Sequence, residues 1–333
     1  MDFNVNDLAV FVQRAVIQGI PLIYGSTGEI ITEKSGNLNL GIPGIMYVGA
    51  ISGVAGAFLY ENSVPAGEPI NAFLGLAIPL LCSLLGSLIM ALIYSFLTIT
   101  LRANQNVTGL ALTTFGVGLG NFFGGSLAKL FGSGTTGIAF NRVRALFIKK
   151  LPFAEDCGWF GTAFLSYTFL AYFAIALAIA VAMFIRKSRI GLNLRAVGES
   201  PATADAAGIN VIRYKYFATC FGGMIAGLGG LYYVVDYIGV WSNGGFGDRG
   251  WLAIALVIFA LWKADLGVLG SILFGALYLL DTVIRTGSLA TQKLIGMIPY
   301  LVTIIVLVAV SVRKKREHQP PESLGLSYFR EER

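Results

Sequence analysis

Long apolar runs separated by short polar stretches dominate the pattern along the chain. A bilayer crossing needs about 20 consecutive apolar residues. Two of the runs, joined at Lys263–Gly267, read as separate helices of which the first is short for a full crossing. The predicted helices are 8–30, 42–60, 72–99, 107–126, 164–185, 212–235, 251–264, 266–284 and 297–312. The pattern predicts an all-α fold, a polytopic integral membrane helical bundle of about 8–10 transmembrane segments.

Two polar stretches interrupt this pattern in the way that is typical of discontinuous or re-entrant membrane segments. They are ITEKSGNLNLGIPGIMYVGA (31–50) and RANQNVTGLALTTFGVGLG (102–120). Freed backbone groups at membrane depth are tolerated only in contact with protein or with a water-filled cavity, and broken helices often mark the substrate path of a transporter. An equal alternative is an ordinary turn in which Asn39 or Asn106 caps the next helix. For Glu33 the ordinary turn is favoured.

Composition supports the membrane class and limits the chemistry. Of the 333 residues, 56% are apolar and 13% charged, well below the roughly 25% charged of a soluble domain. The net charge is +6, but basic residues cluster beside apolar runs, so no nucleic-acid partner is expected. The single histidine, His318, and three scattered cysteines predict neither a metal site nor an enzyme.

Basic residues also predict the orientation. They gather at Arg186, Lys187, Arg189, Arg195, Arg213 and Lys215, and again at Arg313, Lys314, Lys315 and Arg316. The positive-inside rule places both groups in the cytoplasm, and with them the C-terminus. Region 127–163 then lies outside, against its own five basic residues. Long outer loops translocate with weaker dependence on charge, which lessens this conflict.

Few side chains in the sequence could supply energy for transport, either by ATP hydrolysis or by ion coupling. No GxxxxGK[ST] phosphate loop occurs, so any ATP hydrolysis must come from another polypeptide. Convincing mid-span acids, which an ion-coupled carrier needs, are missing from the pattern. Asp281 and Arg285 are four residues apart and are interpreted as an ion pair at the outer end of a helix.

One polar stretch, NLRAVGESPATADAAGIN (193–210), differs from its apolar surroundings. Ser200 is a good N-cap, Pro201 fits a first helical turn, and Gly208 suits a left-handed terminus. The intervening alanines favour a helix of about seven or eight residues, roughly 11 Å long. A helix this short needs something to pack against it. It is either a cytoplasmic docking helix or one turn of a surface loop.

This stretch and three other blocks resemble the permease subunits of ABC importers, in the branched-chain amino acid, ribose and nucleoside class. The other blocks are EKSGNLNLGIPGIMYVGA, LRANQNVTGLAL and GDRGWLAIALVIFALWKADLGVLGSILFGAL, in the family's order. The chain is most similar to the nucleoside permeases that work with basic-membrane-lipoprotein binding proteins. It departs from them at Pro43, where the family tends to have glutamate.

The resemblance implies a machine with several partners in the bacterial cytoplasmic (inner) membrane. These are ABC ATPase subunits that use ATP and Mg²⁺, a second permease subunit (identical or homologous), an extracytoplasmic substrate-binding lipoprotein, and membrane lipid. The chain itself is expected to bind no cofactor. The resemblance also implies that the helix above couples to the ATPase, through Arg195, Ala196, Gly198, Glu199, Ser200, Pro201, Ala204, Asp205 and Gly208.

Under the same resemblance, residues 1–312 form one permease domain, with a coupling loop at 186–212 and a basic cytoplasmic tail at 313–333. Neutral polar groups suit the lining of its translocation path: Asn37, Asn39, Asn104, Asn106, Thr108, Thr113 and Thr114. A nucleoside or related nucleobase compound is the expected cargo. Ribose-like sugars and branched-chain amino acids are the near alternatives, and a secondary carrier or channel is the distant one.

Overall fold

A computed structural model describes residues 5–65, 67–130, 137–154, 156–283, 294–312 and 319–330. Most of these residues are helical. The long helices are α1 (Val5–Glu33), α2 (Ile42–Ser63), α3 (Ala72–Ser95), α4 (Gln105–Leu130), α7 (Phe169–Lys187), α10 (Val211–Leu231), α12 (Ala264–Val283) and α14 (Ile298–Val312). Short π-helical segments, η1 (Phe96–Thr100) and η3 (Tyr232–Ile238), extend α3 and α10.

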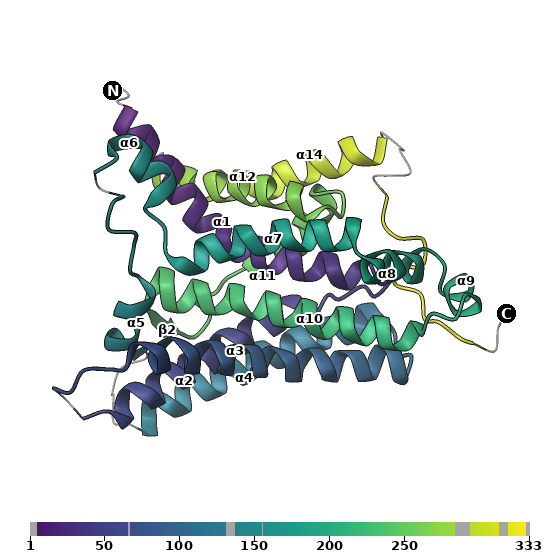
Figure 1. Ribbon diagram of the computed structural model, residues 1–333, viewed down its shortest axis with the longest axis horizontal. Helices are drawn as coiled ribbons and strands as arrows, with labels where there is room; N and C mark the ends of the chain where they lie inside the picture. Colours follow the sequence, from purple (N-terminus) through teal and green to yellow (C-terminus); the bar gives the residue numbers. More distant parts are fainter. Residues whose placement is uncertain are drawn as a thin grey trace.

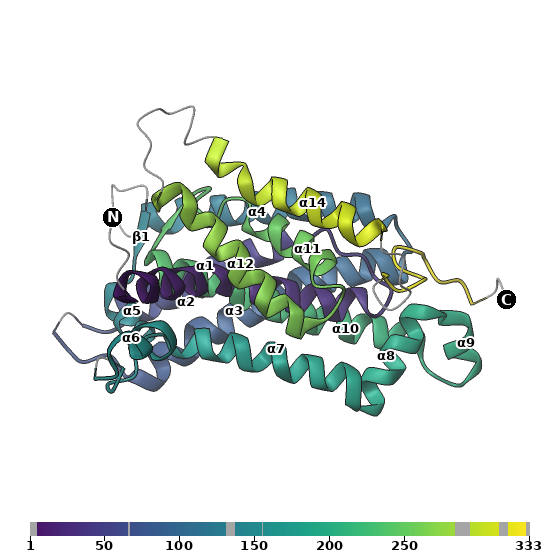
Figure 2. The same ribbon diagram turned by 90° about the horizontal axis from the view of Figure 1, so that it is seen from above.

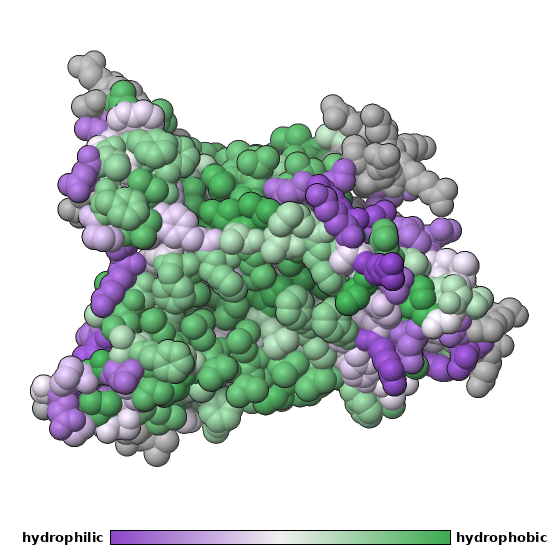
Figure 3. Space-filling view, in the orientation of Figure 1, coloured by the Kyte–Doolittle hydropathy of each residue, from purple (hydrophilic) through white to green (hydrophobic). Residues whose placement is uncertain are grey.

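The described residues contain six helices that are long and apolar enough to cross a membrane, together with three shorter apolar ones. They run side by side along one axis (Figure 1). A broad band of apolar side chains lies between polar ends in Figure 3. The prediction of a multi-pass helical membrane bundle is therefore confirmed.

The predicted division near residue 263 is also present. Helix α11 (Arg249–Phe259) ends in a turn in which Leu261 and Trp262 have positive φ angles of 53° and 55°. Helix α12 begins directly after this turn. Left-handed backbone at two successive non-glycine residues cannot continue a helix, so the apolar run becomes two elements.

Helices α1, α2 and α10 form the centre of the bundle, and glycines allow them to approach closely. A Cβ added at Gly49 of α2 would lie 2.6 Å from the Cα of Gly227 of α10. One added at Gly28 of α1 would overlap the backbone of Gly222. Small residues permit such contacts where lipid supplies no hydrophobic drive between helices.

The two ends of the bundle carry different small elements. At one end lie α5 (Asn141–Phe147), α6 (Gly158–Phe160), η2 (Gly161–Leu165) and the antiparallel pair β1 (Gly137–Ala139) and β2 (Val240–Ser242). At the other lie α8 (Arg189–Glu199), α9 (Pro201–Ala206) and the C-terminal segment 319–330 (Figures 1 and 2). The described part of region 127–163 beyond α4 thus lies opposite α8 and α9, as the orientation argument predicts.

Candidate functional site

The α8–α9 pair is built by local capping. The Ser188 hydroxyl accepts a hydrogen bond from the Gly191 amide (2.9 Å), which starts α8. Ser200 accepts one from Thr203 N (3.4 Å) before Pro201. Gly208 takes a φ of +83° after α9. The predicted short helix is confirmed, whereas α8, which precedes it, is an additional helix.

Helix α9 has an inner and an outer face. Ala204 is only 4% exposed and packs with Val197 and Val211. Ala202 and Ala206 are exposed. Of the residues predicted to couple, Arg195, Ala196, Glu199 and Gly208 are also exposed, Ser200, Pro201 and Asp205 are half-buried, and Gly198 is buried like Ala204. The exposed alanines leave a small, smooth surface that a partner's groove can accommodate.

Gly198 joins this pair to the rest of the bundle. A Cβ added there would overlap the Lys34 carbonyl, so α8 lies directly on the loop between α1 and α2. The Asn193 amide also donates to the Tyr214 hydroxyl of α10 (2.9 Å). Desolvation lowers the pKa of the nearby Lys34 ammonium, and the Glu199 carboxylate partly offsets this. Helix α8 is therefore in direct contact with both the α1–α2 loop and α10.

The C-terminal segment 319–330 packs on the same end. The Ser323 amide and hydroxyl both donate to the Gly198 carbonyl (3.1 and 2.6 Å). Asp205 of α9 accepts a hydrogen bond from the Tyr328 hydroxyl (2.9 Å) and pairs with Arg330 (3.2 Å). The basic charge of the tail gave no hint of this packing. Within LGLSYF (324–329), Leu324 and Tyr328 pack against apolar clusters of the bundle, whereas Leu326 and Phe329 remain exposed.

The α1–α2 loop (34–41) is the more deeply buried of the two polar stretches. Asn37 and Asn39 are both 0% exposed. Asn37 donates to the Thr219 hydroxyl of α10 (3.1 Å), and the Asn39 side chain accepts from the Gly41 amide (2.9 Å). These asparagines hold the loop together, and Asn37 also lines a pocket at this end of the bundle.

The burial of two carboxylates beside this loop was not predicted. Glu29 and Glu33 are 0% and 2% exposed within α1. Glu29 accepts from the Asn39 amide (2.9 Å), and Glu33 accepts from the indole of Trp262. Glu33 is the last residue of α1 and is buried, rather than part of an ordinary exposed turn, and both acids lie in the last two turns of the helix rather than in mid-span. The reason is that the α11–α12 turn places Trp262 over the end of α1, a contact that no local pattern reveals.

The η1–α4 loop (101–104) is different. Asn104 caps α4 by accepting from the Val107 amide (3.1 Å) and is exposed, as is Asn106. Gln105 alone turns inward, accepting from the Leu38 amide (2.7 Å). The capping alternative is thus correct for this stretch, with Asn104 rather than Asn106 as the cap.

The remaining predicted path residues, all on α4, differ in burial. Thr108 and Thr113 are buried, and Thr113 donates to the Leu40 carbonyl (2.8 Å). Thr114 is exposed on the same side as Gly118, where an added Cβ would meet nothing within 4 Å. The seven predicted residues do not gather around one cavity, and their role stays a prediction. Arg285 of the predicted Asp281–Arg285 pair lies outside the described residues, so the pair stays a prediction.

Comparison with known proteins finds similarity to transporter permeases over nearly the whole length of the chain. The family described as "Branched-chain amino acid transport system / permease component" matches residues 11–307. The chain is 32% identical to the nucleoside ABC transporter permease protein NupC of Lactococcus lactis, covering 91% of this chain and 92% of that one. It is 27% identical to the guanosine ABC transporter permease protein NupQ of Bacillus subtilis, over 98% of both. It is also 31% identical to the putative glucose ABC transporter permease protein TsgC13 of Haloferax volcanii, over 99% of both.

Proposed function

Because the chain belongs to the family of branched-chain amino acid transport system permease components, and is thus the multi-pass membrane permease of an ABC transporter, we propose that it imports a nucleoside or related nucleobase compound. The observation that carries this cargo is the pair of nucleoside and guanosine permeases that match at least nine-tenths of the chain. The membrane is the bacterial cytoplasmic membrane, with the α8–α9 end and the C-terminal segment in the cytoplasm.

A separate ABC ATPase supplies the energy. The chain carries no phosphate-cradling GxxxxGK[ST] sequence, so ATP and Mg²⁺ belong to that partner. The exposed side of α9, with Ala202 and Ala206, is the docking surface. An extracytoplasmic substrate-binding lipoprotein delivers the cargo to the opposite end.

The packing supports a route for movement from the ATPase to the path. Force on α9 passes through α8 to the α1–α2 loop at Gly198. Helices α1, α2 and α10 are in backbone contact at their glycines, so they move as one body. Alternating access then consists of this body rocking against the rest of the transporter.

A second permease subunit, identical or homologous, completes the path. The exposed face of α4 carries Asn106, Thr114 and Gly118, and added Cβ atoms at Gly118 and Gly125 would meet nothing within 4 Å. Small residues on a membrane helix favour close packing with another helix. Neutral polar groups on this face can hydrogen-bond an uncharged cargo between the two subunits.

A sugar is the second candidate cargo, since the putative glucose permease is 31% identical over the full length. Uptake into proteoliposomes that hold the chain with its ATPase, partner permease and binding protein separates the two. ATP-dependent accumulation of labelled uridine or guanosine, unaffected by excess glucose, is expected. Accumulation of glucose alone would overturn the nucleoside proposal and leave the permease assignment intact.

A further inference from the structure

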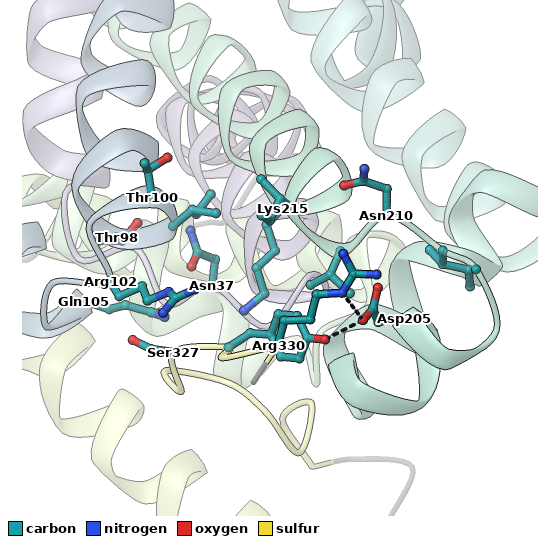
Figure 4. Close-up of a pocket in the computed structure, with 16 residues that line it drawn as sticks. Asn37, Thr98, Thr100, Arg102, Gln105, Asp205, Asn210, Lys215, Ser327 and Arg330 are labelled. Carbon is teal, nitrogen blue, oxygen red and sulfur yellow. Dashed lines mark hydrogen bonds and ion pairs between the residues drawn. The ribbon is translucent and has the colours of Figure 1, made fainter. Parts of the chain in front are cut away.

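A pocket of about 390 Å³ opens where α9, α10, the end of η1 and the C-terminal segment meet. Its walls carry three cationic side chains, Arg102, Lys215 and Arg330, and one carboxylate, Asp205. Figure 4 shows the Lys215 side chain directed into this space, with Arg102 and Arg330 on either side. The pocket thus has an excess of positive charge.

Lys215 is the informative residue. It is 3% exposed, yet within the described residues its ammonium has neither a carboxylate within 4.0 Å nor a hydrogen-bond acceptor. A buried charge without a partner is costly, and proteins normally pair it. The opposing Asp205 already binds Tyr328 and Arg330. Among the described residues Lys215 thus has no anionic partner, and its ammonium, in the wall of an open pocket, is available to an added anion.

Arg102 points to the same conclusion. It has a φ of +56°, an unusual conformation for a residue with a side chain, and such strain gathers at binding sites. Its guanidinium lies 4.5 Å from the centre of the Phe329 ring. This contact holds the guanidinium at the pocket wall, and arginine forks match phosphate oxygens better than point charges do.

We propose that this basic pocket binds the phosphate group of a phosphate monoester or phosphodiester at the cytoplasmic end of the protein. Lys215 and Arg102 hold its oxygens, and the neutral polar side chains of Asn37, Gln105 and Ser327 form other parts of the wall. The volume leaves room for an attached group larger than the phosphate itself. The phosphate belongs either to a soluble metabolite or to the headgroup of an anionic lipid.

Binding would brace the C-terminal segment against α9. Tyr328 and Arg330 line the pocket and contact Asp205, so an occupant connects this segment, α9 and the η1–α4 loop. Occupancy is thus linked to the surface that the proposed function assigns to the ATPase. The binding itself does not rest on the nature of the cargo.

The test uses the purified full-length chain in phosphatidylcholine nanodiscs. Ribose 5-phosphate, with ribose as the neutral control, is titrated while the melting temperature and the heat of binding are recorded. In the lipid arm, phosphatidylglycerol retained after detergent washing is measured by native mass spectrometry. The variant is Lys215→Met, and the control is Lys263→Met, which removes a lysine from a neighbouring pocket at the same end.

We expect one of the two phosphate probes to bind the original chain and the control variant equally. Lys215→Met should weaken that binding at least about tenfold, the effect of losing one charge-assisted hydrogen bond. Without a probe, Lys215→Met should melt at the same temperature or higher, because an unpaired buried charge has been removed. A soluble probe that binds identifies a metabolite, and retained phosphatidylglycerol identifies a lipid.

Equal behaviour of all three proteins toward both probes would overturn the proposal. It would also fall if neither probe binds and Lys215→Met instead abolishes association with the ATPase. That result would assign the pocket to a carboxylate of the ATPase. Neither outcome bears on whether the chain carries nucleosides, which the uptake experiment decides separately.

Discussion

The α1–α2 loop and the η1–α4 loop resemble each other in sequence and differ in the structure. Both combine asparagines with small or polar residues beside an apolar helix. In the first, Asn37 and Asn39 are fully buried and bonded to groups from other parts of the bundle. In the second, Asn104 caps its own helix at the surface. Polar residues in the sequence therefore predict where a helix is interrupted. The packing of other helices around the loop determines whether its side chains bond to them or only cap the next helix.

The difference arises from how backbone groups are satisfied. The Leu38 amide is bonded by Gln105, and the Leu40 carbonyl by Thr113. Buried backbone groups need partners of this kind, because no water reaches them. The η1–α4 loop is exposed, so local capping is sufficient. Substitutions in and around the two loops should therefore destabilise the chain to different degrees, with larger losses at the buried loop.

The largest effect is expected where α8 meets the α1–α2 loop. Gly198→Ala places a methyl group against the Lys34 carbonyl and should destabilise the chain by about 3 kcal/mol, at the upper end for overpacking. The measurement is the melting temperature of the purified chain. Gly118→Ala is the matched control, since nothing lies within 4 Å of its added Cβ, and it should melt no lower than the original chain. Equal melting of both variants would show that the contact is not tight.

An intermediate effect is expected inside the α1–α2 loop. Asn37→Leu removes the hydrogen bond to Thr219 and leaves buried polar groups unpaired, at a cost of about 2 kcal/mol. The Asn37→Leu/Thr219→Val double variant should recover part of that loss, because both partners are then apolar. Melting temperatures of the four proteins test this coupling. Additive losses would contradict a direct interaction.

A smaller effect is expected from Asn104→Ala in the η1–α4 loop. The variant loses one N-cap hydrogen bond, to the Val107 amide, and should lose about 1 kcal/mol or less of stability. Asn104→Ser, which restores a capping oxygen, should melt like the original chain. A loss as large as that of Asn37→Leu would remove the distinction between the two loops.

The smallest stability effect is expected for Asn106→Ala. Its exposed side chain has no hydrogen bond to the described residues, so the change should stay within about 0.5 kcal/mol. If Asn106 lines the path, nucleoside uptake by the reconstituted transporter should still fall severalfold. Unchanged uptake would remove Asn106 from the predicted lining.

Local sequence patterns predicted the features that local interactions determine, namely the positions and ends of helices. Ser200, Pro201 and Gly208 mark the ends of α9 because caps and left-handed glycines act on adjacent backbone groups. The long helices were likewise evident from apolar length. Trp262 over Glu33, and Ser323 on Gly198, join residues more than 120 positions apart. No spacing along the chain encodes such contacts.

The faces of α9 show the same limit at the candidate site. The alanine-rich sequence predicted a helix, and the resemblance implied that it couples to an ATPase. Which alanines face outward depends on where Val197, Val211 and Tyr328 pack. Ala204 proves to be inside and Ala206 outside.

Ala206→Arg tests most directly whether α9 is the docking surface for a separate ATPase. Ala206 is exposed at the last position of α9, where a cation is favourable, so the chain should melt normally. Ala145→Arg, at an exposed position on α5 at the opposite end, is the control. In the reconstituted complex we predict that Ala206→Arg loses most ATPase binding and ATP-driven uptake, while Ala145→Arg retains both. Normal binding and uptake by Ala206→Arg would contradict the account.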